Sequence, residues 1–318
     1  MPGILTIAKK EFTDHVSDHT FLLCFGVLLL VMITGSYGFV LDVQEEVLRN
    51  PSMERQFGSD FFWKENYVGL VTAIIRPFSL LGILAAIVVS INSISKERIE
   101  GSLKVLLSYP LNKSELILGK ILGGALVLAA VAMSSMIICF SLVMFYLSIA
   151  PTYEILARIA VVVGLGMVLL FFILCVGTTL SILFRDANTV LIGSILVVNA
   201  LQPEMMQMTL LSLSVILPQI GIHFNIPQLL RYGNPPTFLY STAEFRKIAA
   251  FTPTESYLSF SYSIFKFQNY SSYPKDTVIP VNFDWLIPRY LDLAQTVILW
   301  AFAAFIVCYL LFRRGDVG

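Results

Sequence analysis

Long apolar stretches constrain this chain more than any other feature. A helix needs about 20 apolar residues to cross a ~30 Å hydrocarbon core. Stretches of that length or more lie at residues 20–40, 72–95, 121–149, 156–184 and 290–312. The composition agrees, since 57% of the residues are hydrophobic and only 13% are charged, against about 25% in an average soluble domain. The sequence therefore predicts an all-α membrane protein.

One further span is interrupted. The apolar run at residues 189–201 would form only about 20 Å of helix, which is too short to cross. A second run at 205–217 follows Pro203, so either one kinked helix crosses or the two runs form a hairpin. Lys and Arg, including Arg313 and Arg314, gather where six spans would place the inner segments. The positive-inside rule therefore favours six transmembrane helices, a multi-pass protein of the cell membrane and two cytoplasmic termini.

The N-terminal residues 4–17 suit a helix that lies along the inner membrane surface. Their apolar side chains fall on one helical face, whereas the charged ones, Glu11 among them, are expected elsewhere. The apolar residues of this face are Ile4, Ile7, Ala8 and Phe12.

Residues 219–288 are polar and rich in Tyr and Pro. A connection this long without structure is uncommon, so we expect an ordered extracellular cap between spans 5 and 6 that buries Tyr232, Phe238 and Tyr240. The expected division is then residues 1–218 for the interfacial helix and spans 1–5, 219–288 for the cap, and 289–318 for span 6 with a cytoplasmic tail.

A charged segment, Lys96–Lys120, separates the second and third spans. Its five basic residues place it in the cytoplasm. Apolar residues recur in it at helical spacing and predict an amphipathic helix that Pro110 ends. Asn112 and Glu115 then form a capping-box pattern that begins the next helix. The apolar residues are Ile99, Leu103, Leu106 and Leu107. Such a face between two spans suits contact with a soluble partner.

The same segment carries a family pattern: Glu97-Arg98, Gly101-Ser102, Leu103 to Leu107, Ser108-Tyr109-Pro110 and Leu118-Gly119-Lys120. It resembles the loop between spans 2 and 3 of ATP-binding-cassette (ABC) exporter permeases of the second type. The nearest subgroup includes the nitrous-oxide-reductase maturation permease. The resemblance implies a separate ABC ATPase subunit that binds ATP and Mg, no cofactor in this chain, and a dimer with a second permease copy or homologue. The implied ATPase-coupling residues are Glu97, Arg98, Glu100, Gly101, Leu103, Leu106, Leu107, Tyr109 and Pro110. The alternative for the charged cluster is a solvated surface.

Four polar residues are candidates for a substrate path: Arg76, Asn92, Thr178 and Asn199. Arg76 either contacts an anionic substrate or, the favoured alternative, snorkels to the outer interface. Asn92, like its neighbour Ser90, and Thr178 either line a vestibule or pack and hydrogen-bond between helices, which is favoured. Asn269, in Asn-Tyr-Ser, fits a glycosylation acceptor on the predicted outer side.

Enzymatic chemistry has no pattern to support it. The glycines at 119, 123 and 124 do not form a phosphate loop and suit close helix packing instead. His15 and His19 read as a polar helix face and not as a metal site. The cysteines all lie in apolar runs, and the Met205–Met208 run is disfavoured as a copper site. The formal net charge is zero, which gives no support for nucleic-acid binding.

The predicted function is that of a permease subunit that exports a substrate, with ATP hydrolysed in another chain. The apolar spans suggest an amphipathic or lipid-like substrate, and membrane lipid is an expected partner. The alternative is a mechanotransmitter that moves an extracellular partner protein through the cap and transports nothing. A continuous cavity between protomers would favour export, and a closed midplane below a grooved cap would favour the alternative.

Overall fold

Helices make up nearly all of the part of the chain that the structure describes. The computed structural model describes residues 2–52, 54, 62, 66–91, 93–94, 113–184, 186–201, 252–265 and 287–314. The longer helices are α1 (Pro2–Val16), α2 (His19–Arg49), α6 (Arg76–Ile91), α9 (Lys113–Tyr146), α10 (Tyr153–Leu183), α11 (Ala187–Leu201), α15 (Pro253–Phe265) and α16 (Ile287–Arg314). A short helix α5 (Tyr67–Leu70) and a π-helical turn η1 (Val71–Ile75) precede α6. These residues contain no strand, so the predicted all-α class is confirmed for them.

Five helical segments are long and apolar enough to cross a membrane. They are His19–Arg49, Tyr67–Ile91, Ser114–Tyr146, Ile155–Leu183 and Asp292–Arg314, which correspond to the predicted spans 1, 2, 3, 4 and 6. The predicted fifth span begins as α11, which has 15 residues, and its continuation lies outside the described residues. The count of six spans therefore stays a prediction.

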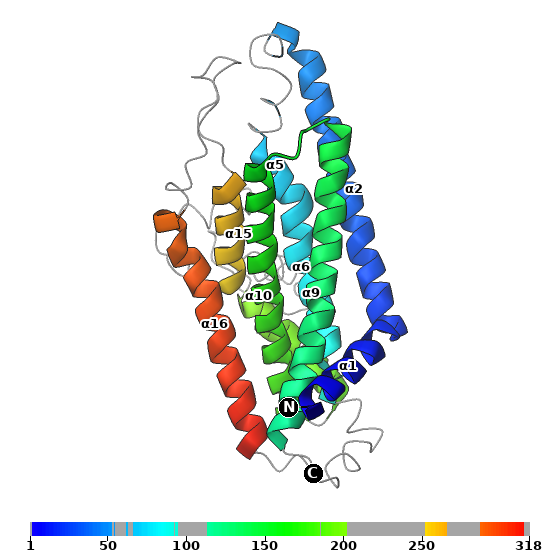
Figure 1. Ribbon diagram of the computed structural model, residues 1–318, viewed down its shortest axis with the longest axis vertical. Helices are drawn as coiled ribbons and strands as arrows, with labels where there is room; N and C mark the ends of the chain where they lie inside the picture. The colour runs from blue at the N-terminus through cyan, green and yellow to red at the C-terminus, as the bar shows by residue number, and fades with distance from the viewer. Residues whose placement is uncertain are drawn as a thin grey trace, which may run out of the picture.

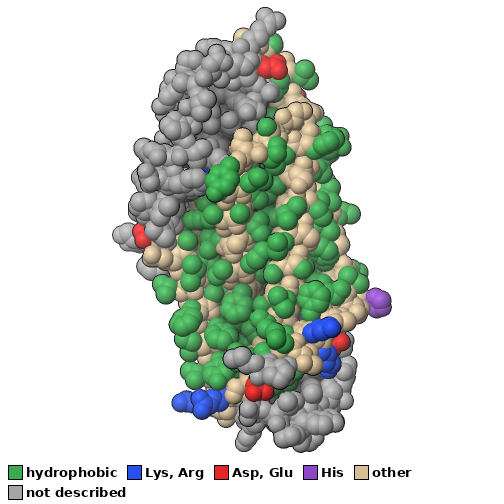
Figure 2. All heavy atoms as spheres, viewed as in Figure 1, with side chains coloured by type: hydrophobic (Ala, Val, Ile, Leu, Met, Phe, Trp, Pro, Cys, Tyr) green, Lys and Arg blue, Asp and Glu red, His purple; other side chains and the backbone are tan. Residues whose placement is uncertain are grey.

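The spans form an elongated bundle with α6, α9 and α10 at its centre (Figure 1). These three helices bury about half or more of their most apolar part, whereas α2 and α16 flank them and bury much less. Figure 2 shows hydrophobic side chains over the middle of the visible face and charged side chains toward its two ends. This distribution is the one expected of a bundle that sits in a bilayer.

Helix α2 extends beyond the predicted first span. We expected a polar loop after residue 40, but the helix continues to Arg49. Val40 and Val43 are buried on one face of this extension. Glu45 and Arg49 form an exposed ion pair one turn apart, at 2.5 Å, on another face. The predicted loop was wrong between residues 41 and 49, because the polar residues there are the outer face of an amphipathic helix.

The second span is irregular where Pro77 enters it. Proline has no backbone N–H, and the π-helical turn η1 lies directly before it, with the Arg76 N–H bonded to the Val71 carbonyl five residues back. Helix α2 approaches this turn closely, since a Cβ on Gly35 would lie 2.6 Å from the Ala73 carbonyl oxygen. The glycine is therefore required by the approach of α2 to the distorted turn.

The predicted N-terminal helix is present as α1, which crosses the base of the bundle and packs mainly on α9. The C-terminal end of α16 lies at the same end of the bundle (Figure 1). We call this the α1 end. Its assignment to the cytoplasm remains a prediction from charge.

Helix α15 belongs to the segment predicted as an outer cap. It packs against α10 and α16, in the half of the bundle remote from α1. Tyr257 on α15 is completely buried, and its ring lies 6.4 Å from that of Phe78 on α6. This part of the segment therefore contributes to the helix bundle itself. The cap residues Tyr232, Phe238 and Tyr240 lie outside the described residues.

Candidate functional site

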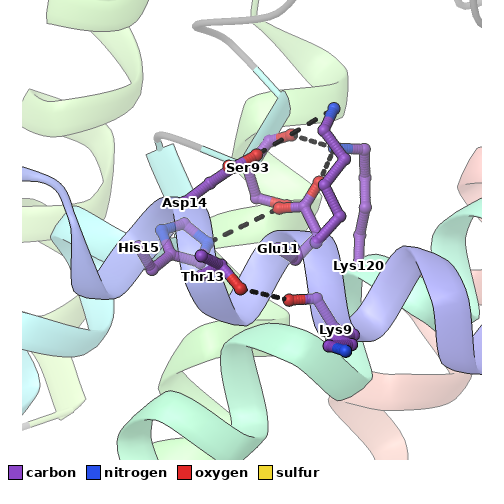
Figure 3. A network of polar contacts seen from close by, with 8 residues as sticks. Lys9, Glu11, Thr13, Asp14, His15, Ser93 and Lys120 are labelled. Carbon is purple, nitrogen blue, oxygen red and sulfur yellow. Dashed lines mark hydrogen bonds and ion pairs between the residues drawn. The ribbon is translucent and has the colours of Figure 1, made fainter.

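Three chain segments meet at a buried ion pair near the α1 end. They are α1, the residues Ser93 and Ile94 just after α6, and the first turns of α9. Figure 3 shows Lys120 of α9 reaching across to both Glu11 of α1 and Ser93. We call Glu11, His15, Ser93 and Lys120 the inner junction.

The Lys120 ammonium bridges two partners. Its Nζ lies 2.5 Å from Glu11 Oε1 and donates to the Ser93 carbonyl oxygen at 2.8 Å. The other carboxylate oxygen of Glu11, Oε2, lies 3.6 Å from His15 Nε2. Lys120 is 2% exposed, Glu11 5% and His15 3%, so bulk water does not screen the pair.

Two glycines bring α1 and α9 this close. A Cβ on Gly119 would lie 2.7 Å from the Cβ of Ile7, and one on Gly123 would lie 2.5 Å from the Cβ of Glu11. The Gly123 position also faces the Ala8 backbone, with the carbonyl oxygen at 2.8 Å. The Gly-x-x-x-Gly spacing is typical of helices whose backbones touch. The prediction that these glycines serve helix packing is confirmed for both.

Burial makes the inner junction sensitive to the loss of one partner. Removing one member of a buried pair typically costs about 3–5 kcal/mol, because the other charge is left uncompensated, whereas apolar replacement of both is often neutral. Helix α1 cannot slide along α9 without separating the Lys120 and Glu11 charges. The junction therefore holds these segments in one register.

The outer face of α1 is polar and solvated. Lys10 and Asp14 lie 3.9 Å apart there with 59% and 60% of their side chains exposed. The predicted placement of Glu11 and His15 on such a face was wrong, because both are buried against α9. His19 is exposed at the start of α2, as predicted.

The predicted path residues do not form one site in the described part of the chain. Arg76 is half-buried at the start of α6, whereas Thr178 lies near the end of α10. Thr178 is 1% exposed, and its hydroxyl donates to the Leu174 carbonyl of its own helix at 2.6 Å. That arrangement favours packing over a substrate contact. Asn199 lies in α11, and Asn92 lies outside the described residues.

Ser90, the neighbour of Asn92, also serves packing. Its hydroxyl donates to the Ile87 carbonyl at 2.7 Å, and a Cβ on Gly177 would overlap it. The ends of α6 and α10 nearest the α1 end are therefore in close contact, as the packing interpretation predicted.

The predicted ATPase-coupling residues, from Glu97 to Pro110, lie outside the described residues, and so does Asn269. The structure describes the residues on either side of the coupling segment, Ser93 and Ile94 before it and α9 after it. Helix α9 begins at Lys113, as the pattern of Asn112 and Glu115 predicted.

A second polar contact, absent from the sequence-based predictions, joins α10 to α15. The Arg158 guanidinium donates to the Ile264 carbonyl in the last turn of α15, where cations are favoured. The Tyr257 hydroxyl, nearer the start of α15, is buried and has no hydrogen-bond partner within the described residues. Burial raises the pKa of this phenol, so the group stays neutral.

Among the described residues, no group of three or more His, Cys, Asp or Glu side chains is arranged to hold a metal ion. The residues of the inner junction can hold charged groups in fixed positions. The sequence predicted Lys120 only as one of the basic residues of the coupling segment and its family pattern, and Glu11 only as a charged residue away from the apolar face of α1.

The sequence was compared with known protein families. The family model described as "ABC-2 family transporter protein" matches residues 5–317, from α1 to beyond α16. No curated protein gave a match. The match confirms the ABC permease resemblance at the level of the family, and it agrees with a multi-pass chain that works with a separate ABC ATPase. The chain belongs to the ABC-2 family of transporter proteins, as a membrane permease subunit.

Proposed function

We propose that this permease exports an amphipathic or lipid-like substrate from the cytoplasmic side, driven by ATP hydrolysis in its partner. The support for such a substrate is the apolar surface of the flanking helices α2 and α16. Leu23 and Leu30 on α2 and Leu299 and Phe302 on α16 are each more than 60% exposed. These surfaces can be covered by lipid, by substrate or by a second permease.

A second copy or a close homologue would complete the transporter by packing on part of this surface. The proposed location is the cell membrane with both termini in the cytoplasm. The subgroup of the nitrous-oxide-reductase maturation permease is proposed only from the pattern within residues 97–120.

The ATPase is proposed to dock on the coupling segment, residues 96–110. The observation that supports this docking site is the position of the residues on either side of the coupling segment. The Lys120–Ser93 hydrogen bond of 2.8 Å holds the end of the second span beside the start of α9, at the α1 end. The described residues on either side of residues 95–112 therefore lie close together beside α1. A soluble subunit that pushed on this segment would act on three helices at once.

Replacing Leu106 and Leu107 with Asp tests the docking. Each change removes apolar contact of about 1.5–3 kcal/mol, so the double variant should reduce co-purification of the ATPase at least tenfold. The matched control is Leu5→Asp on the exposed side of α1, where 66% of the leucine is already exposed. Undiminished recovery of the ATPase with the double variant would contradict the docking proposal.

Export itself is tested with the complex in proteoliposomes whose ATPase faces outward. A fluorescent phospholipid should become protected from an external quencher when MgATP is added. If the complex hydrolyses ATP but the probe does not move, the mechanotransmitter alternative is favoured, at least for this substrate class.

A further inference from the structure

We propose that Lys120 is a positioning residue for transport: it makes α1, α9 and the inner end of the second span move as one body. This inference rests on the proposed function, since it assumes that an ATPase pushes on the coupling segment. It concerns how that push reaches the spans, which docking alone does not determine.

The first support is the place of Lys120 in the chain. Ser93 lies just before the coupling segment, and Lys120 lies two turns into α9, just after it. The bond from Lys120 Nζ to the Ser93 carbonyl therefore joins the two flanks. A push on the segment cannot spread these flanks apart unless this bond breaks.

The second support is the bond to Glu11. It extends the same link to α1, whose backbone already touches α9 at Gly119 and Gly123. Helix α1 continues into α2 through a tight turn, in which the Asp18 N–H donates to the His15 carbonyl at 3.1 Å. Movement of α1 is thereby passed to α2, the long span on the flank of the bundle.

The third support is the chemistry of the group. One ammonium carries several donors from a single point, and a buried charge keeps its partners because water cannot replace them. Lys120 is therefore suited to hold three segments in a fixed arrangement. A lysine at the surface would exchange its partners for water.

A purely structural role is the alternative, and the double variant Glu11→Met with Lys120→Met separates the two. It keeps side chains of similar length and leaves no unpaired charge, so the complex should assemble and unfold near the wild-type temperature. It also removes the link to Ser93. A structural role predicts that normal stability brings normal movement, whereas a positioning role predicts normal stability with lost movement.

Movement can be measured without knowing the substrate. Spin labels would be placed on cysteines replacing Lys9, exposed on α1, and Gln295, exposed on α16, after substitution of the four native cysteines. The distance between the labels is compared in the nucleotide-free complex and in the complex trapped with MgATP and vanadate. Lys10→Met, which removes an exposed lysine of α1, is the matched control.

We expect the ATP-dependent distance change to fall to less than a third in the double variant and to persist in Lys10→Met. Equal movement in the double variant and the wild type overturns the inference alone. A wild-type complex that hydrolyses ATP without any change in distance overturns the inference and leaves the ATPase partnership standing. If the double variant fails to assemble, Glu11→Gln with Lys120→Gln, which also leaves no unpaired charge, must reduce the movement, or the inference is overturned.

Discussion

Gly123→Ala tests the close packing of α1 on α9. The added Cβ would lie 2.5 Å from Glu11 Cβ and 2.8 Å from the Ala8 carbonyl oxygen, whereas ordinary contacts begin near 3.4 Å. The backbone of α1 cannot rotate out of the way as a flexible side chain can. Helix α1 must therefore move away from α9, and Glu11 moves with it, away from Lys120.

The expected loss of stability of Gly123→Ala is the sum of three contributions. Overpacking of a close contact costs about 1–3 kcal/mol, and weakening a hydrogen bond between charged groups costs up to about 1.5–3 kcal/mol. The higher helix propensity of Ala over Gly offsets about 1 kcal/mol. The net loss of stability for Gly123→Ala is then roughly 1.5–5 kcal/mol.

Gly164→Ala in α10 is the matched control, because no atom lies within 4 Å of the position of its Cβ. There the change should stabilise by about 0.5–1 kcal/mol. Thermal unfolding of both purified variants in the same detergent, followed by tryptophan fluorescence, should give shifts of opposite sign. A midpoint for Gly123→Ala at or above that of Gly164→Ala would refute the packing of α1 on α9.

Three smaller predictions follow from single residues and their contacts, and a fourth follows from the predicted topology. Arg158→Met should raise hydrogen exchange in α15, because the last turn of that helix loses the guanidinium that donates to the Ile264 carbonyl. Unchanged exchange would show that this hydrogen bond does not stabilise α15. Asp186→Ala should destabilise by about 1 kcal/mol in thermal unfolding, since Asp186 Oδ2 caps α11 through the Thr189 N–H at 3.0 Å. Tyr257→Phe should leave the unfolding midpoint unchanged or raise it, because a buried hydroxyl without a partner costs about 1–3 kcal/mol; a clear fall would reveal a partner. Single cysteines at positions 114 and 272 should react with an impermeant thiol reagent from opposite sides, and reaction of both from one side would mean an even number of crossings between them, with span 5 a hairpin.

The spans were predictable because a long apolar run has few alternatives. A segment such as residues 156–184 can satisfy its backbone in a bilayer only as a helix, and α10 covers nearly that range. The ends were less certain. Helix α2 continues past its apolar run because Val40 and Val43 keep one face buried, and a rule based on mean apolarity does not detect a continuing amphipathic face.

The position of α15 could not be read from composition. Its sequence mixes Ser, Thr, Tyr and Phe, which suits a small outer domain as well as a helix against the spans. The contact that holds its end, from Arg158, joins residues 106 positions apart. Long-range pairings of this kind are decided by tertiary packing and leave no local pattern.

The inner junction is different, because its signal was present in the sequence. Glu11 and His15 continue the same helical stripe as Ile4, Ile7 and Ala8, at spacings of three and four residues. A carboxylate on an otherwise apolar stripe has to find a cation if the stripe is buried. Lys120 is such a cation: it lies between Gly119 and Gly123 at the start of a span, where a neighbouring helix can approach. Taken alone, each residue has an ordinary alternative, Glu11 as a surface acid and Lys120 as an interfacial base. Taken together, the glycine spacing and the two charges identify the one arrangement in which neither charge is buried without a partner.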